Sequence, residues 1–418
     1  MYLSMDYMLQ KFNIARYGTP LLTYAVRWLL FLLLCKGIHI IVFMPHTFHH
    51  LLLTTDKLVL IKESFEQELI AALYGKVTSI SFLHNPLPPS ATIKNGEIFQ
   101  VMVVGGSIFK YALIKKENDQ ISIIKETKDS LPVFDTDRIF LEFIDSHLDP
   151  SISYLSLNFA YPIQSITRDN LTDAVLSREG KEQAFEGLVG KMVGKTIEEY
   201  VFTKYKRMIR VAVANDTVCL FLSEVTKNTW GTTVACIIGT GINHAFAINK
   251  EIINLESAGF KQFSPTDSGK VVDLESKNKG RALIEKEIAG AYLYRHFNII
   301  NQQNNLGFPP LSSTKELSLL AAKNGSASSL AQVLLERSAS LAATQMAGIV
   351  EFLSNRLDST HLANFLFVME GTLFWEGYNY RSYLEKYLKM FGVDDKLDFS
   401  KTRHHSIQGA IKLLIGLS

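Results

Sequence analysis

The sequence predicts an α/β protein built from two packed units or one large two-lobed unit, and three observations support this prediction. The chain has 418 residues, which is more than one compact core usually holds. Apolar residues make up 47% of the sequence and charged residues 20%, a balance typical of globular domains. Segments with strand patterns alternate along the chain with segments of helical spacing, and this alternation is typical of α/β layers.

In the first half of the folded part, a helix comes first and a strand meander follows. After Asp56 the sequence KLVLIKESFEQELIAAL places apolar residues three and four apart, which predicts an amphipathic helix. Apolar runs separated by GGS and KENDQ predict an antiparallel meander over residues 98–104, 108–114 and 121–125. The next expected elements are a helix over 135–148, a strand over 154–159, a helix over 186–205 and a strand over 208–214.

The second half begins with a hairpin and continues mainly as helices. Residues 233–238 and 243–248 have strand patterns on either side of a GTG turn. The clearest helical patterns cover residues 280–297, 331–353 and 380–391. Residues 301–329 are rich in Asn, Ser, Gly and Pro, which indicates a surface excursion.

Charge and cysteine content exclude several classes of protein. Lys and Arg number 43 against 41 Asp and Glu, so the net charge of +2 creates no field that would attract nucleic acid, and no nucleic-acid partner is expected. Cys35, Cys219 and Cys236 are far apart and form no CxxC pair. This spacing argues against a disulfide framework or a thiolate zinc site and favours a cytoplasmic location. No metal-ligand set is predicted.

Residues 21–44 are mostly apolar and long enough at helical rise to cross a bilayer core. Arg27 and Lys36 interrupt them, and charges inside a membrane span are costly. Two interpretations stay open here. The segment is a membrane-associated anchor, or it lies upstream of a start at Met44.

Three short motifs follow strands, where polar chemistry is expected in α/β proteins. They are Gly105-Gly106-Ser107, Asn215-Asp216-Thr217 and Gly239-Thr240-Gly241. Glycine turns let backbone N–H groups approach a phosphate, although either turn alone equally fits ordinary hairpin geometry. Asp216 follows a wholly apolar strand end, so its carboxylate would emerge near a cleft or cap the next helix.

Taken in order, these segments resemble the hexokinase family, and the resemblance runs from about Leu51 to Ser418. It rests on six segments in the family's order, which are VAVANDTVCLFLS, ACIIGTGIN, INLESAGF, IEKEIAGAYL, ERSASLAATQMAGIV and MEGTLF. The resemblance implies an actin-like ATPase (ribonuclease H-like) fold, with a cleft between a small and a large domain. It places the small domain at residues 97–213 plus 401–418 and the large domain at 51–96 plus 214–400. Residues 1–50 form an extension.

The reaction that the resemblance implies is phosphoryl transfer from ATP, with Mg²⁺, to the 6-hydroxyl of a hexose, with glucose as the first expectation. Asp216 would accept the hydroxyl proton. The implied sugar-binding residues are Ser177, Arg178, Asn215, Asn243, Glu256 and Glu285, since amides and carboxylates match the hydroxyls of a pyranose. The implied nucleotide-binding residues are Gly105, Gly106, Ser107, Lys110, Gly239, Thr240, Gly241, Gly371, Thr372 and Ser406.

Several positions depart from the family's pattern. Val103 stands where the family's first phosphate loop has an aspartate that helps to hold magnesium through water. Ala160 replaces a serine near the sugar, while Ser177 and Arg178 replace a Thr-Lys pair. In the last nucleotide segment the departures are His404 for an aspartate and His405 and Ile407 for two glycines.

Two functions therefore stay open from the sequence. Retention of Asp216 favours an ATP-dependent hexose kinase, because a pure sugar sensor does not need a carboxylate base. Val103 favours a catalytically weak or inactive relative that binds sugar as a sensor or scaffold. A chaperone or filament protein of the same fold is disfavoured, because Glu256 and Glu285 would then have no role.

Overall fold

The computed structural model describes residues 48–89, 93–105, 108–118, 120–177, 184–356, 364–401 and 404–417. The chain divides into two units, Met1–Thr47 and Phe48–Ser418, and only the second contains described residues. The membrane anchor suggested at residues 21–44 therefore lies outside the described residues. Within the described part of the chain, no helix combines the length and the apolar character that crossing a bilayer requires.

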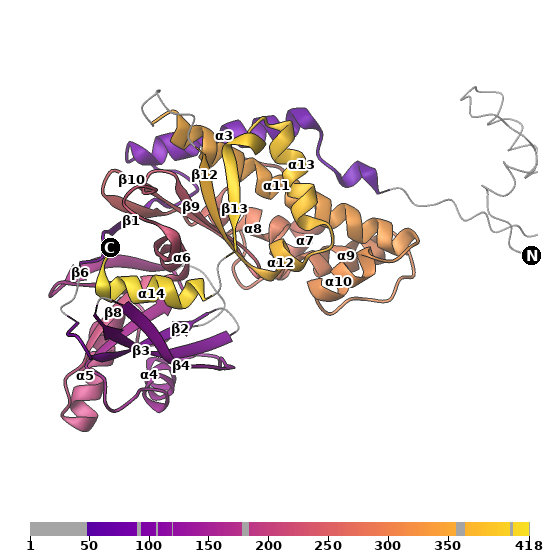
Figure 1. Cartoon of the computed structure of the whole chain (residues 1–418). Helices are drawn as coiled ribbons and strands as arrows, with labels where there is room; N and C mark the ends of the chain where they lie inside the picture. The colour runs from indigo at the N-terminus through magenta and orange to yellow at the C-terminus, as the bar shows by residue number, and fades with distance from the viewer. Residues whose placement is uncertain are drawn as a thin grey trace, which may run out of the picture. The chain divides into compact units, whose positions relative to one another are not determined.

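Five strands from the first half of the chain form one sheet (Figure 1). In spatial order the strands are β4 (Gln120–Ser130), β3 (Ile108–Glu117), β2 (Ile98–Val104), β5 (Tyr154–Phe159) and β8 (Arg210–Asn215). β2, β3 and β4 are antiparallel, whereas β5 pairs in parallel with both β2 and β8. A separate hairpin joins β6 (Ile163–Arg168) to β7 (Leu171–Leu176).

Different helices cover the two faces of this sheet. Val101 and Val103 of β2 belong to one core with α6 (Asp216–Glu224) and α14 (His405–Ile415). Met102 and Val104 belong to another core with α4 (Asp137–Ser146) and α5 (Val193–Tyr205). Because successive side chains of a strand point to opposite faces, a continuous apolar run is what a sheet buried on both sides requires.

A six-stranded sheet forms the second layer. In spatial order its strands are β1 (Leu83–Pro86), β11 (Glu251–Asn254), β10 (Ile242–Ile248), β9 (Thr233–Ile238), β12 (Phe365–Glu370) and β13 (Leu397–Ser400). β9, β10, β11 and β1 pair in antiparallel fashion, and β12 runs parallel to β9 and β13. The end of β9 and the end of β12 are therefore neighbours.

The helices of the second half pack mainly around one long central helix, α11 (Ser326–Ser354), which is buried along most of its length. It contacts α3 (Thr55–Leu73) and α13 (Tyr380–Met390) most extensively. The remaining helices and 3-10 turns are η1 (His49–Leu51), η2 (Ser257–Gly259), α7 (Asp267–Glu275), α8 (Leu283–Ile288), α9 (Leu293–Gln303), α10 (Thr314–Ala321), α12 (Thr372–Glu376) and η3 (Asp394–Lys396).

α6 joins the two sheets. It contacts β8 of the five-stranded sheet and β9 and β10 of the six-stranded sheet. Ala214 on one sheet and Ala235 and Ala245 on the other share a single core with Val218 and Leu222 of α6. The alanines on these strands leave room for the helix between them.

Most of the predicted elements are confirmed. The helix after Asp56, the three-stranded meander, the strand Tyr154–Phe159, the hairpin around GTG and the two long C-terminal helices are all present. The sequence-based prediction does not include several elements that the structure contains, among them β1, the β6–β7 hairpin, β11, α7, α12, β13 and α14. The predicted domain boundaries stay a prediction.

Three of the sequence-based predictions, two of helices and one of a surface excursion, are wrong in part. The helix expected from residue 186 begins at Val193, because Gly187 and Gly190 have φ of +90° and +79°, which an α-helix cannot accommodate. The helix expected over 280–297 is two helices, because Ala289 is extended and the Gly290 N–H donates to the Gly239 carbonyl at 2.8 Å. The surface excursion expected over 301–329 contains α10, whose Leu317 and Ala321 are fully buried.

Gly409 decides how closely α14 approaches α6, which lies beside it in Figure 1. A Cβ atom at this position would lie 1.7 Å from the carbonyl oxygen of Cys219 on α6. No real side chain can make that contact, so the two helices must separate if Gly409 is replaced.

Replacing Gly409 with alanine should therefore destabilise the protein by at least ~2 kcal/mol, as overpacking of a close backbone contact does. Urea unfolding of Gly409→Ala measures this change. Gln408→Ala, in the same helix at a half-buried position, is the control and should change the free energy of unfolding by less than ~0.5 kcal/mol. Equal stability of the two variants would contradict the close approach of α14 to α6.

His296 is a buried neutral histidine that ties α9 to α7 and α8. Its Nε2 lies 2.8 Å from the carbonyl oxygen of Lys286, which can only accept, so Nε2 carries the proton. Its Nδ1 lies 2.9 Å from Ser268 Oγ and accepts from that hydroxyl. Burial lowers the pKa of His296, because an imidazolium ion would lose its hydration there.

This burial makes stability depend on pH. An unfolded histidine takes up a proton near pH 6.5, whereas folded His296 stays neutral to lower pH. The free energy of unfolding should therefore fall as the pH falls below ~6.5, by up to ~1.4 kcal/mol per pH unit for this group.

His296→Gln should remove that part of the slope, as measured by urea unfolding between pH 7.5 and 4.5. A wild-type slope in His296→Gln would mean that folded His296 is already protonated in this range.

Candidate functional site

The site begins where β8 ends and α6 starts. Asn215 caps the helix, and its Oδ1 accepts from the Thr217 N–H at 2.9 Å. The Asn215 amide also donates to the carbonyl of Tyr161 at 3.3 Å, which ties the turn to the end of β5. Asparagine is favoured at this position because its side chain accepts from a backbone N–H that the first turn of a helix leaves without a partner.

Asp216 is the first residue of α6 and is half-buried. Its Oδ1 accepts from the Thr217 N–H at 2.9 Å and lies 3.4 Å from the Thr217 hydroxyl. The positive end of the helix dipole favours a carboxylate here. These contacts orient the Asp216 carboxylate at the surface of a helix that is otherwise buried.

Hydrogen bonds continue from α6 into the six-stranded sheet. The Asn243 amide donates to Thr217 Oγ1 at 3.0 Å and to Asn254 Oδ1 at 2.8 Å. The Asn254 amide donates in turn to Glu256 Oε1 at 2.9 Å. The structure therefore joins Asp216, Asn243 and Glu256 in one chain of hydrogen bonds, with Thr217 and Asn254 as the links.

Glu256 has a left-handed backbone, with φ of 44° and ψ of 47°. This conformation is uncommon for a residue that carries a Cβ atom and costs about 1–3 kcal/mol. Such strain persists only where neighbouring contacts enforce it, and it is typical of ligand sites.

Glu285, on α8, approaches the same region from the other side of the GTG turn. Its Oε2 accepts from the Ile242 N–H at 3.2 Å, one residue before Asn243. A Cβ atom on Gly241 would lie 2.7 Å from the same oxygen, so a larger residue there would displace the Glu285 carboxylate. Hydrogen bonds therefore connect the region of Asn215, Asp216, Asn243, Glu256 and Glu285, and the sugar-binding role of these residues stays a prediction.

Two of the predicted nucleotide turns touch each other. A Cβ on Gly239 would lie 3.1 Å from the Cα of Gly371, and Gly371 has φ of +120°. A Cβ on Gly371 would lie 2.1 Å from the Ile238 carbonyl oxygen. Thr240 and Thr372, the residues beside these glycines, are exposed. The two turns therefore place backbone groups and two threonine side chains at the neighbouring ends of β9 and β12.

Residues 404–407, at the start of α14, are held in place by contacts with strands and with the core around α6. His405 Nε2 lies 2.9 Å from Glu370 Oε2 at the end of β12, and His404 Nδ1 lies 2.8 Å from Glu126 Oε2 on β4. Ser406 is buried, and its carbonyl accepts from the Asn158 amide at 3.2 Å. Ile407 is fully buried in the core around α6. The residues that replace an aspartate and two glycines therefore contact carboxylates or pack in the core.

The residues at the end of β2 do not fit a carboxylate-held magnesium ion. Val103 is 7% exposed and pairs in register with Lys110 on β3 and Asn158 on β5, and none of the three carries a carboxylate. In the described part of the chain, no three His, Cys, Asp or Glu side chains gather as a metal site would require. Magnesium prefers oxygen ligands, most often from carboxylates and substrate phosphates.

The other predicted residues divide into those the structure places and those it does not describe. The Ser177 N–H donates to the Pro162 carbonyl at 2.9 Å, next to Tyr161, which accepts from Asn215. Gly105 directly follows β2, and Lys110 is half-buried on β3. Gly106, Ser107 and Arg178 lie outside the described residues. Ala160 follows β5, and its N–H donates to the Val104 carbonyl at 3.0 Å.

Four polar residues that hydrogen-bond to Asn243 have no role in the sequence-based prediction, namely Thr217, Asn254, His244 and Ser257. Asn254, at the end of β11, is only 1% exposed. Its side-chain amide links Asn243 and Glu256, two of the predicted sugar ligands. A polar residue in the apolar run IINLE is the signal that could have identified it, because a buried amide requires partners. Thr217 lies within the quoted NDT segment itself.

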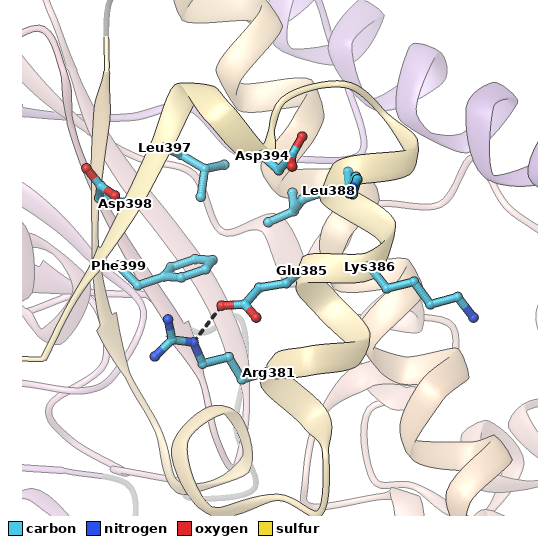
Figure 2. A pocket seen from close by; sticks show the side chains of 9 residues that line it. Arg381, Glu385, Lys386, Leu388, Asp394, Leu397, Asp398 and Phe399 are labelled. Atoms are coloured by element: carbon cyan, nitrogen blue, oxygen red, sulfur yellow. Dashed lines mark hydrogen bonds and ion pairs between the residues drawn. The ribbon is translucent and has the colours of Figure 1, made fainter.

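A separate pocket lies between α13 and β13 (Figure 2) and contains none of the predicted site residues. Both signs of charge line it, and the Arg381 Nε donates to Glu385 Oε1, one turn further along α13, at 2.7 Å. Its lining includes three basic side chains (Arg381, Lys386, Lys389) and three acidic ones (Glu385, Asp394, Asp398), so the formal charges of the lining cancel.

No family model matches the sequence. Hexokinase-9 from Oryza sativa subsp. japonica is 27% identical over 232 residues, which is 47% of this chain and 45% of that protein. The match thus spans less than half the length of that relative.

Solved structures share the fold. A hexokinase crystal structure aligns with a TM-score of 0.67 at 19% identity, over 87% of this chain and 96% of that one. A hexokinase from Schistosoma mansoni complexed with glucose aligns with a TM-score of 0.62 at 16% identity, over 86% of this chain and 95% of that one. The chain therefore has the two-lobed actin-like ATPase fold.

Proposed function

We propose that this chain, a divergent member of the hexokinase family, phosphorylates a hexose at its 6-hydroxyl with ATP as the phosphoryl donor. Glucose is the first candidate sugar, and the similar Schistosoma mansoni structure contains glucose. ATP would enter with its magnesium ion as the second substrate. A cytoplasmic location belongs to this proposal and is supported by the buried free thiols of Cys219 and Cys236.

One observation carries the proposal. Asp216, Asn243 and Glu256 are joined by hydrogen bonds through Thr217 and Asn254, and Glu285 reaches the same strand through the Ile242 N–H. Carboxylates accept and amides both donate and accept, so the set matches the alternating donors and acceptors of a sugar's hydroxyls. An ATPase that binds no sugar would have no use for this arrangement.

Asp216 is the proposed general base. A carboxylate within hydrogen-bond reach of the sugar's 6-hydroxyl accepts its proton as the hydroxyl oxygen attacks the γ-phosphorus, and ADP leaves. The bonds from Thr217 hold one carboxylate oxygen, Oδ1. The turns at Gly239 and Gly371 would contact the phosphates, since backbone N–H groups at glycine turns approach anions closely.

The alternative function is a sugar-binding sensor or scaffold with weak or no turnover. It is favoured by the buried Val103, the buried Ile407 and the ion pair between His405 and Glu370 at the end of β12. Each of these replaces polar or flexible nucleotide contacts with packing or pairing. Sugar binding is common to both functions, so turnover is what separates them.

The first test is a coupled assay of ADP formation with glucose, fructose, mannose and N-acetylglucosamine. Asp216→Ala should lower turnover by about 10²–10⁴-fold, the usual contribution of a positioned base, while hexose binding stays measurable. Asp267→Ala is the matched control, because Asp267 is also the first residue of a helix and is exposed there.

Turnover of Asp216→Ala within about tenfold of the wild type would contradict the role of Asp216 as base. Hexose binding without turnover in the wild type would instead support the sensor.

The second test concerns Val103→Asp. A carboxylate at the end of β2 should lower the magnesium concentration needed for half-maximal turnover, because it restores charge that can orient metal-bound water. Because the side chain is 7% exposed, the same change should also cost about 1–3 kcal/mol of stability. Magnesium titration and thermal unfolding measure the two effects.

Val103→Ala serves as the control that loses packing without gaining charge. A folded Val103→Asp variant with unchanged magnesium dependence and rate would show that the segment MVVGGS does not correspond to the first phosphate loop.

A further inference from the structure

A cluster of polar side chains lies in the core directly behind Glu256. His244 on β10, Ser257 in η2 and Gln345 on α11 are all fully buried. Ser257 Oγ lies 2.9 Å from His244 Nδ1, and the Gln345 amide donates to the Ser257 carbonyl at 3.2 Å. Burial lowers the pKa of His244 to about 3, so the imidazole is neutral at physiological pH.

Stability alone does not account for this cluster. Burying polar side chains costs free energy unless every polar atom is paired. Among the described residues, neither His244 Nε2 nor Gln345 Oε1 has a hydrogen-bond partner. Apolar side chains of similar size would pack this part of the core at lower cost, so a different role is needed to explain the polar ones.

The cluster holds the segment that carries Glu256. The Leu255 N–H donates to the His244 carbonyl at 2.9 Å, and Ser257 contacts the His244 ring. His244 therefore hydrogen-bonds to both Leu255 and Ser257, the residues on either side of Glu256. The left-handed backbone of Glu256 is strained, and strain of this kind persists only when flanking contacts enforce it.

The same contacts reach Asn243. Its Oδ1 accepts from the His244 N–H at 2.8 Å and from the Ser257 N–H at 3.2 Å. Because these bonds hold the side-chain oxygen of Asn243, its NH₂ group faces Thr217 and Asn254 and donates to both. Movement of Ser257 would therefore disturb both Glu256 and Asn243.

We infer that His244 and Ser257 are positioning residues of the sugar site, whose hydrogen bond holds Glu256 and Asn243 in the geometry that binds the hexose. This inference rests on the proposed sugar site, because it assigns a role through Glu256 and Asn243 rather than by direct contact with the sugar. A merely structural hydrogen bond would affect stability and leave affinity unchanged.

The chain contains a matched control for that distinction. Ser268 Oγ and His296 Nδ1 form the same kind of bond, at 2.9 Å, between two buried side chains. Their hydrogen bonds reach Thr266 and Lys286 and none of the proposed sugar ligands. Each of the variants Ser257→Ala and Ser268→Ala therefore removes a buried serine hydroxyl that is hydrogen-bonded to a neutral histidine.

The experiment is isothermal titration of the full chain and both variants with glucose, fructose, mannose and N-acetylglucosamine, together with thermal unfolding. We expect the two variants to lose thermal stability alike. Ser257→Ala should weaken affinity for the bound hexose by at least about tenfold, whereas Ser268→Ala should stay within about twofold of the wild type.

His244→Asn and His244→Leu provide a second comparison at the other partner. The asparagine keeps a hydrogen-bonding atom near the position of Nδ1, so it should bind hexose more tightly than the leucine variant. Equal affinity of folded Ser257→Ala and wild type, or equal affinity of the two His244 variants, would overturn the positioning role alone. Absence of hexose binding by the wild type would overturn the proposed sugar site and the positioning role with it.

Discussion

Burial of α6 between the two sheets is the constraint on which the rest of the described structure depends. Residues 217–222 of this helix are all buried, against strands of both sheets and against α14, where Gly409 meets the Cys219 carbonyl. A helix enclosed on all sides cannot shift without disturbing both sheets. Its first turn, with Asn215 and Asp216, is consequently held in a defined position, which a group that must meet a substrate hydroxyl requires.

The polar residues of the site form one connected unit rather than separate ligands. The Asn243 amide donates to both Thr217 and Asn254, and the Asn254 amide donates to Glu256, so these two asparagines lie between the Asp216 and Glu256 carboxylates. Carboxylates repel one another, and the intervening amides keep them apart while hydrogen-bonding to their neighbours. The buried His244 and Ser257 extend this unit into the core, where packing holds it.

The two proposed sides of the site depart from the family's pattern to different extents. On the proposed sugar side, hydrogen bonds through neighbouring residues connect Asn215, Asp216, Asn243 and Glu256, and Glu285 accepts from the Ile242 N–H. On the nucleotide side, Val103 and Ile407 are buried in the core around α6, and His405 pairs with Glu370. Apolar packing stabilises the fold but supplies no charge to a phosphate or a metal. The divergence therefore bears on phosphoryl transfer more than on sugar recognition.

The sequence by itself determined the α/β class, the strand meander, the GTG hairpin, the long C-terminal helices and the identity of the main polar residues, because these depend on local periodicity and on motifs in order. Tertiary structure alone decided where helices break, as at Gly190 and Gly290, since those breaks depend on turns and on contacts with distant residues such as Gly239. It also decided that Asn254, His244 and Ser257 hydrogen-bond to the candidate site residues Asn243 and Glu256. Their importance comes from burial and from partners distant in sequence, and neither is encoded in the spacing of neighbouring residues.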